Sequence, residues 1–267
     1  MFAAIRLPAA PPVQRIAETV NGLKTTHISP KAIDKVMRQA WQHIYAGNLA
    51  NATEAFQKFL AKYDRHILKQ PPVILADLTG PQIIEEIHLA KPSAGGLDGW
   101  KPHELGCISL LAAQQLARLL NAIERGAPWP KAACQAKAAF LPKGEDSEDP
   151  LNYRVLSILS VLYRRWASCR HKDLQPWIAT WGLEEFFAGV GPNGAEDAWY
   201  TTSAIFENAR LKHQDLTGGA CDVWKCFDQV SRMFLNLLLS TGGCPAGVFQ
   251  AYSSFHAQAV YYNSIAG

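Results

Sequence analysis

Apolar residues recur every three or four positions in several stretches of the sequence, a spacing that predicts amphipathic helices. The first stretch covers residues 30–45, and Ser29 and Pro30 before it are typical of a helix start. Its apolar face consists of Ile33, Val36, Met37, Ala40, Trp41, Ile44 and Tyr45. A second helix is expected after Asn51, which forms a capping box with Glu54. Both helices must bury their apolar faces, against each other or against the chain downstream.

The same spacing predicts further helices along the chain. We expect them at residues 83–87, 108–124, 161–175, 195–211 and 229–239, and after Pro245. Residues 1–28, in contrast, contain several prolines and little periodicity, so we interpret them as an irregular lead-in.

Short extended segments are predicted between these helices. Residues 138–141 and 153–158 are expected to form a hairpin with a polar, acidic tip at 144–150, and residues 258–263 a further strand. Residues 220–224 follow two glycines and form a short apolar run, which predicts a buried strand. This mixture of helices and strands indicates an α+β fold.

Asp222 lies inside the apolar run 220–224. A carboxylate is costly to bury unless it is paired or binds a metal, so we expect Asp222 to have a functional role, although it could instead cap the next helix. For Asp228 we favour the structural interpretation, as N-cap of a helix that begins near Gln229.

Composition adds few constraints. The chain has 267 residues, of which 48% are hydrophobic, and a net charge of only +3, so any binding of nucleic acid would need a local basic patch. The six cysteines lack the spacing of a zinc site, which favours free thiols in a reducing compartment. We recognise no signal peptide and no membrane span, so we expect an intracellular protein, cytoplasmic or nuclear, that does not contact a membrane.

Several short motifs occur in a characteristic order. They are Gly-Gly-Leu-Asp-Gly at 95–99, Ala-Phe-Leu-Pro-Lys at 139–143, Asn-Tyr-Arg-Val-Leu-Ser-Ile at 152–158, Phe-Ala-Gly-Val-Gly at 187–191, Ala-Glu-Asp-Ala at 195–198, and Asp222 with Phe227 and Asp228. Their order and spacing over residues 77–267 resemble the reverse transcriptase domain of non-LTR retroelements. The chain departs from the usual family pattern at Leu97 and Val155, and at Glu184 and Glu185.

The resemblance implies a right-hand polymerase fold that is truncated. Residues 1–72 would be a helical lead-in, 73–190 the fingers and 191–267 the first half of the palm. The complete enzyme would be an RNA-directed DNA polymerase, a nucleotidyltransferase that uses magnesium in a two-metal mechanism. The family's later Pro-Gln-Gly turn and paired aspartates do not occur in this sequence, so the chain alone is expected to be inactive.

The resemblance also implies roles for individual residues. Asp222 would be a catalytic magnesium ligand, together with the carbonyl of Val223. Phe227 would lie beneath the sugar of the incoming deoxynucleoside triphosphate and exclude a 2′-hydroxyl. Lys143 and Arg154, on opposite limbs of the hairpin, would bind the triphosphate.

Positive charge is concentrated in residues 164–172. Arg164, Arg165, Arg170 and Lys172 are candidate contacts to the RNA template and DNA primer, although such runs are often solvated helix faces. An alternative function is a non-catalytic, nucleic-acid-binding remnant of a retroelement. Another right-hand polymerase, such as a group II intron maturase, fits the motifs at 195–198 and 227–228 less well.

Overall fold

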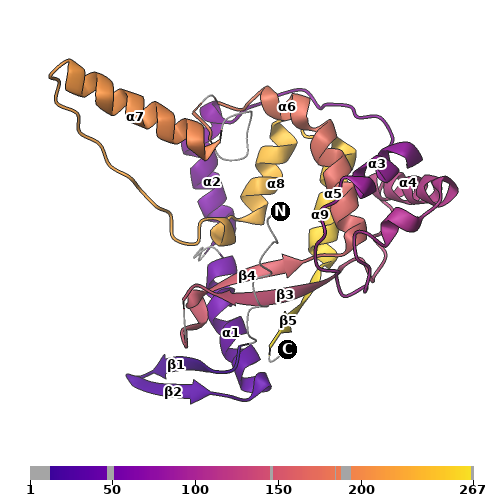
Figure 1. The fold of residues 1–267 in the computed structure, drawn as a ribbon, viewed down its shortest axis with the longest axis horizontal. Helices are drawn as coiled ribbons and strands as arrows, with labels where there is room; N and C mark the ends of the chain where they lie inside the picture. Colours follow the sequence, from indigo (N-terminus) through magenta and orange to yellow (C-terminus); the bar gives the residue numbers. More distant parts are fainter. Residues whose placement is uncertain (1–12, 47–50, 145–146, 184, 188–193, 266–267) are drawn as a thin grey trace, which may run out of the picture.

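The computed structural model describes residues 13–46, 51–144, 147–183, 185–187 and 194–265. The helices are α1 Pro30–Tyr45, α2 Ala52–Tyr63, α3 Gly80–His88, α4 Leu110–Glu124, α5 Val161–Asp173, α6 Gln175–Ala179, α7 Ala195–Leu211, α8 Arg232–Thr241 and α9 Ala246–Gln258. The strands are β1 Ile16–Val20, β2 Leu23–His27, β3 Gln135–Pro142, β4 Tyr153–Ile158 and β5 Val260–Ser264. Short 3₁₀ helices are η1 Asp64–His66, η2 Leu105–Cys107, η3 Pro150–Asn152 and η4 Phe227–Gln229. The expected α+β class is therefore confirmed (Figure 1).

A β-hairpin near the N-terminus departs from the sequence-based expectation. Strands β1 and β2 pair antiparallel around a two-residue turn at Asn21 and Gly22, whose φ values of 51° and 80° lie in the left-handed region. Asn-Gly is the preferred sequence for such a turn because both residues tolerate positive φ. The interpretation of residues 16–27 as irregular lead-in is therefore wrong.

Helix α1 forms as predicted and covers one face of the central sheet. The Ser29 hydroxyl accepts a hydrogen bond from the Ala32 amide at 3.3 Å, which caps the helix. The apolar face packs with Phe140 of β3 and Tyr153 of β4 in a shared core. Its other members include Ile16, Ile33, Val36, Met37, Trp41 and Ile44. The lead-in thus shares a hydrophobic core with the hairpin of the predicted fingers.

The central sheet has three strands in the order β4-β3-β5. Strands β3 and β4 form the predicted antiparallel hairpin, with Phe140 opposite Val155 and Leu141 opposite Arg154. Strand β5 lies parallel to β3 on its other side. Because side chains alternate between faces, Phe140 and Val155 lie on the face toward α1, whereas Leu141 and Arg154 lie on the opposite, outer face.

A second core joins α3, α4, α5 and α9. Trp129 lies at its centre, with its ring 5.5 Å from the rings of Tyr163, Trp166 and Phe255. The Trp129 indole also donates to the Ala251 carbonyl at 2.9 Å. The segment 93–100 packs on the start of α5, where the Ser160 hydroxyl donates to Asp98 at 2.6 Å.

The prediction of a buried strand at residues 220–224 is wrong. Residues 214–223 are extended but outside any strand, and their side chains are exposed. A strand exists only beside a partner, and within the described part of the chain no strand pairs with this segment. The next helix also begins later than expected: Ser231, not Asp228, precedes α8, and Asp228 lies in η4.

Helix α7 projects away from the other elements (Figure 1). Its bounds match the prediction, yet Ala209 is its only buried residue. The neighbouring segment 188–193, which holds most of the Phe-Ala-Gly-Val-Gly motif, lies outside the described residues, as does Glu184. In the parts of the chain that the structure describes, no helix is long and apolar enough to cross a membrane.

Candidate functional site

The β3–β4 hairpin places Lys143 and Arg154 near its tip. The Lys143 amide donates to the Asn152 carbonyl at 3.0 Å, which extends the pairing by one residue beyond Pro142. Arg154 lies opposite Leu141, two positions before Lys143, and both basic side chains are exposed. The two cations are thus brought onto neighbouring positions of one hairpin, as the sequence predicted.

The outer face of the sheet carries further basic and aromatic side chains. Lys137 of β3 lies opposite Tyr262 of β5, on the same face as Arg154. Tyr262 and Leu156 are about half exposed. We call these residues, with Lys137 and Arg154, the outer sheet face.

Asp222, Val223 and Phe227 lie in the loop between α7 and α8. Asp222 is exposed, Val223 is 63% exposed and Phe227 is 93% exposed. The loop tightens at its end, where the amides of Cys226 and Asp228 donate to the carbonyls of Val223 and Lys225 at 3.2 and 3.1 Å. These turns bring Phe227 to the surface, whereas Asp222 remains in the extended part.

Phe227 lines a pocket of about 640 Å³ between α1, the inner sheet face and the start of α8. Trp41, Tyr45, Phe140 and Tyr261 contribute further aromatic walls. Polar groups in the lining include Arg38, Gln42, Ser157, Asp228, Arg232 and Asn263. Burial, with the nearby charge of Asp228, raises the pKa of Tyr45 to about 12, so its hydroxyl is protonated.

The hairpin tip and this loop are close to each other. The Lys225 ammonium lies 3.9 Å from the centre of the Trp41 ring and 5.5 Å from that of Trp224. Burial lowers the pKa of Lys225, and the positive charge of Lys143 lowers it further. Asp149 and Asp228 act in the opposite direction. Lys143 therefore lies close enough to Lys225 to disfavour the charged form of that lysine.

The described residues do not make a complete metal centre. A two-metal site needs carboxylates that converge on ions about 3.5–4 Å apart. No group of three or more histidine, cysteine, aspartate or glutamate side chains that could hold a metal is found in the described ranges. Asp222 lies on an exposed loop and can contribute at most one carboxylate. All six cysteines are free, as predicted.

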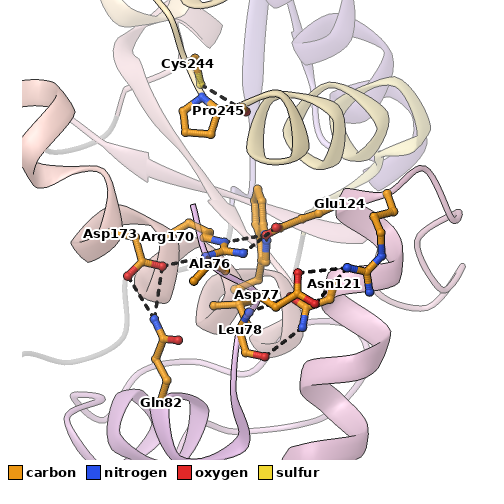
Figure 2. Close-up of polar contacts among 12 residues, drawn as sticks. Ala76, Asp77, Leu78, Gln82, Asn121, Glu124, Arg170, Asp173, Cys244 and Pro245 are labelled. Carbon is orange, nitrogen blue, oxygen red and sulfur yellow. Dashed lines mark hydrogen bonds and ion pairs between the residues drawn. The ribbon is translucent and has the colours of Figure 1, made fainter. Parts of the chain in front are cut away.

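Arg170 is buried, contrary to its predicted role as a template contact. Its side chain is 4% exposed and makes a bidentate ion pair with Glu124, at 2.7 and 2.6 Å (Figure 2). It also donates to Asp173 at 2.8 Å and to the Ala76 carbonyl at 3.0 Å. Glu124 further accepts from the Trp166 indole at 2.7 Å. With its donors used inside the protein, Arg170 joins α4, α5 and the segment before α3, and cannot reach a phosphate.

The other residues of the basic run also bind protein groups. Arg164 donates to the Ser93 hydroxyl at 3.0 Å and the Ala94 carbonyl at 2.8 Å, and Arg165 donates to the Glu86 carbonyl at 3.0 Å. Lys172 pairs with the carboxylates of Glu85 and Glu86. Burial alone would raise the pKa of Glu86, but hydrogen bonds from Lys172 and Ser168 outweigh burial and lower it. Arg164, Arg165 and Lys172 therefore join α5 to α3 and to the segment that follows α3.

Two residues near the hairpin tip and the loop of Asp222 and Phe227, Trp41 and Lys225, have no functional signal in the sequence. The sequence pattern assigns Trp41 only to the buried face of a helix, and it gives Lys225, between Asp222 and Phe227, no role. Their contact joins positions far apart along the chain, so no local pattern could reveal it.

Comparison with known proteins gives a partial match. The chain is 28% identical over 149 residues to the "Retrovirus-related Pol polyprotein from type-1 retrotransposable element R2" of Nasonia vitripennis. The match covers 55% of this chain and 14% of that polyprotein, so the chain spans a small part of its relative. No protein family model matches the chain.

Proposed function

We propose that residues 77–267 are part of a reverse-transcriptase-related domain, which in its complete form copies an RNA template into DNA. The partial similarity to a retrotransposable-element polyprotein supports the proposal. The observation that carries it is the proximity of two motifs far apart in the sequence. Trp41 donates to the Pro150 carbonyl near the hairpin tip at 3.0 Å, and its ring lies 3.9 Å from the ammonium of Lys225, which lies between Asp222 and Phe227 in the sequence. A polymerase needs its phosphate-binding and acidic residues to face one place.

Within this proposal, Lys143 at the hairpin tip binds the triphosphate of a deoxynucleotide. Arg154, which the sequence assigned to the same role, lies on the outer sheet face, opposite the face that Phe227 lines, and is assigned to nucleic-acid phosphates instead. Arginine offers a planar fork of donors and lysine a mobile point charge, both suited to phosphate oxygens. Phe227 contacts the sugar, and Asp222 with the Val223 carbonyl contributes ligands to magnesium. Because the described residues do not complete a metal site, the remaining carboxylates are assigned to other parts of the complete polypeptide, and chain 1–267 by itself is proposed to be inactive.

The contact to template and primer is assigned to the outer sheet face. Arg164, Arg165, Arg170 and Lys172 are engaged with protein groups, whereas Lys137 and Arg154 lie on a face that also exposes Tyr262. Positive charge beside an exposed aromatic ring suits single-stranded nucleic acid, because phosphates pair with the cations and bases stack on the ring.

A second candidate function is a nucleic-acid-binding remnant without catalysis. It is favoured by the absence of a gathered set of acidic ligands among the described residues. The two candidates share the outer sheet face and differ in the role of the loop that carries Asp222 and Phe227. Only the polymerase requires this loop to select a nucleotide.

Sugar selection by the complete polypeptide separates the two candidates. Single-nucleotide incorporation on an RNA template is measured with matched ribo- and deoxynucleoside triphosphates. Replacing Phe227 by Val opens space beneath C2′ without removing a metal ligand, so we expect ribonucleotide use to rise relative to deoxynucleotide use. Loss of both activities in Phe227→Val, with no change in their ratio, would show that Phe227 has no role in sugar selection.

Salt-dependent binding tests the outer sheet face in chain 1–267. Titration of a single-stranded RNA at several salt concentrations gives a slope of log affinity against log salt, to which each neutralised phosphate contributes about 0.7. We expect Lys137→Gln and Arg154→Gln each to weaken binding and to reduce the slope by about this amount. Lys91→Gln removes an exposed charge elsewhere and is the matched control. Equal slopes in all three variants would remove the outer sheet face from the proposal.

A further inference from the structure

Trp41 of α1 contacts two segments that belong to the candidate site. Its side chain is buried, with 3% exposed. The indole Nε1 donates to the Pro150 carbonyl at 3.0 Å, at the tip of the β3–β4 hairpin. The face of its ring supports the Lys225 ammonium at 3.9 Å, in the loop that carries Asp222 and Phe227. One side chain of the lead-in therefore joins the hairpin tip to this loop.

The backbone of Lys225 indicates that this contact holds the loop. Its φ of 48° is in the left-handed region, which a residue with a side chain adopts only when its surroundings favour it. A lysine above an aromatic face gains an attraction that increases when the pair is shielded from water. The neighbouring amides of Asp228 and Gln229 both donate to the Lys225 carbonyl, at 3.1 and 3.2 Å, so the conformation of Lys225 determines the turn that exposes Phe227.

The lead-in holds the other segment, the hairpin tip, at additional points. Glu148 forms ion pairs with Arg15 at 3.2 Å and with Lys24 at 2.7 Å, and its carbonyl accepts from the Ala17 amide at 2.8 Å. These contacts come from the β1–β2 hairpin and its approach, next to α1 in the sequence. The hairpin tip is thus fixed to the lead-in, and Trp41 extends this connection to the loop.

We propose that Trp41 is a positioning residue, which holds the loop bearing Asp222 and Phe227 against the hairpin bearing Lys143 through a hydrogen bond on one side and a cation–π contact on the other. This inference rests on the proposed function for what the two segments do, and on the contacts of Trp41 for how they are joined. In this role, Trp41 lets the lead-in contribute to nucleotide binding in addition to covering the sheet.

The two contacts can be removed separately. Trp41→Phe keeps an aromatic face for Lys225 but removes the donor to Pro150, Lys225→Met removes the cation but keeps the hydrogen bond, and Trp41→Leu removes both. Lys225→Arg restores a cation above the ring. Lys35→Met removes an exposed charge from α1 and serves as the control for the change in charge.

Hydrogen exchange of chain 1–267 measures the protection of amides in the hairpin tip and in the loop. It needs neither nucleotide nor enzymatic activity, so its result is independent of whether the polymerase proposal holds. The reporters are the amides of Leu151 and Asn152 at the hairpin tip and of Cys226, Asp228 and Gln229 in the loop, all of which donate hydrogen bonds, and α4 is the folding reference. In Lys225→Met we expect about 10-fold faster exchange in the loop alone, with protection restored in Lys225→Arg. Trp41→Phe should accelerate the hairpin tip alone, and Trp41→Leu both segments.

Two results would overturn the inference. The first is loop exchange in Lys225→Met equal to that in Lys35→Met, which would show that the cation–π contact does not hold the loop. The second is equal acceleration of both segments and α4 in every Trp41 variant, which would show that Trp41 only supports general packing. A deoxynucleoside triphosphate titration then connects position with binding: weakened binding in Lys225→Met and its recovery in Lys225→Arg are expected, while unchanged binding in both would contradict the positioning role.

Discussion

Arg170 illustrates how a residue that suggests nucleic-acid binding in the sequence can have a structural role. Its partners Glu124 and Ala76 lie 46 and 94 positions away in the sequence. The basic run 164–172 itself contains no acidic residue that could pair with its charges. The structure supplies those partners from α3, α4 and the segment before α3. Burial of one arginine among basic neighbours cannot be deduced from the run itself, because it depends on which helices meet.

Replacing Arg170 should therefore reduce stability before it affects any ligand. Arg170→Met leaves Glu124 buried without its partner, and breaking a buried ion pair in this way costs about 3–5 kcal/mol. The free energy of unfolding in urea measures this loss. Arg118→Met, on the exposed side of α4, should change it by less than about 0.5 kcal/mol. Adding Glu124→Gln to Arg170→Met should recover part of the loss. Equal stability of Arg170→Met and Arg118→Met would contradict the buried network.

His256 gives a prediction for the dependence of stability on pH. Burial, with the nearby charge of Arg232, lowers the pKa of His256 to about 4, and its ring lies 3.3 Å from the Tyr163 hydroxyl. The unfolded chain takes up this proton near pH 6.5, so acidification favours unfolding between about pH 6.5 and 4 and has no such effect above pH 7.

Comparison of pH 7 with pH 5 isolates this effect. We expect His256→Gln to lose less stability than the natural chain over this interval, by roughly 1 kcal/mol, because solvent screens a half-buried group. The free energy of unfolding at both pH values is the measurement. His88→Gln, at an exposed position, should follow the natural chain, and an identical loss in all three proteins would show that His256 is not held neutral.

At the scale of elements, the sequence predicts best those segments whose signals are local. The predicted caps of α1 and α2 are seen in the structure at Ser29 and Asn51, and the hairpin of β3 and β4 forms as expected. The β1–β2 hairpin could have been found from Asn21 and Gly22. Whether residues 220–224 form a strand could not be decided from their own sequence, because an extended segment becomes a strand only when another strand pairs with it.

Helix α7 is predicted to be the least stable long helix of the described chain. Trp199 and Phe206 are 74% and 60% exposed, and Ala209 is its only buried residue. A helix of this length gains little stability without tertiary contacts. Amide exchange in α7 should therefore be at least about 100-fold faster than in α5, which is packed into the second core. Equal protection of α7 and α5 would mean that α7 is covered in solution, and dependence of that protection on protein concentration would identify a second copy as the cover.

At the scale of the whole molecule, the sheet and the lead-in form one unit around the hairpin that carries Lys143 and Arg154. The sequence places these residues correctly on one hairpin because their spacing is local. The connection from this hairpin to the loop of Asp222 and Phe227 runs through Trp41 and Lys225, and such a link between distant segments has no signal in a single sequence. The candidate site is thus partly predictable: sequence motifs identify its members, but not the side chains that hold them together.

The proposed function makes Asp222 part of the catalytic site of a template-dependent polymerase. Primer extension on an RNA template by the complete polypeptide, compared with its Asp222→Ala variant, measures whether Asp222 has this role. Asp215→Ala, in the same exposed segment, is the matched control, and chain 1–267 alone is assayed beside them. We predict synthesis by the complete polypeptide and by Asp215→Ala, and none above background by Asp222→Ala or by chain 1–267. Synthesis by Asp222→Ala at the rate of the natural polypeptide would contradict the account.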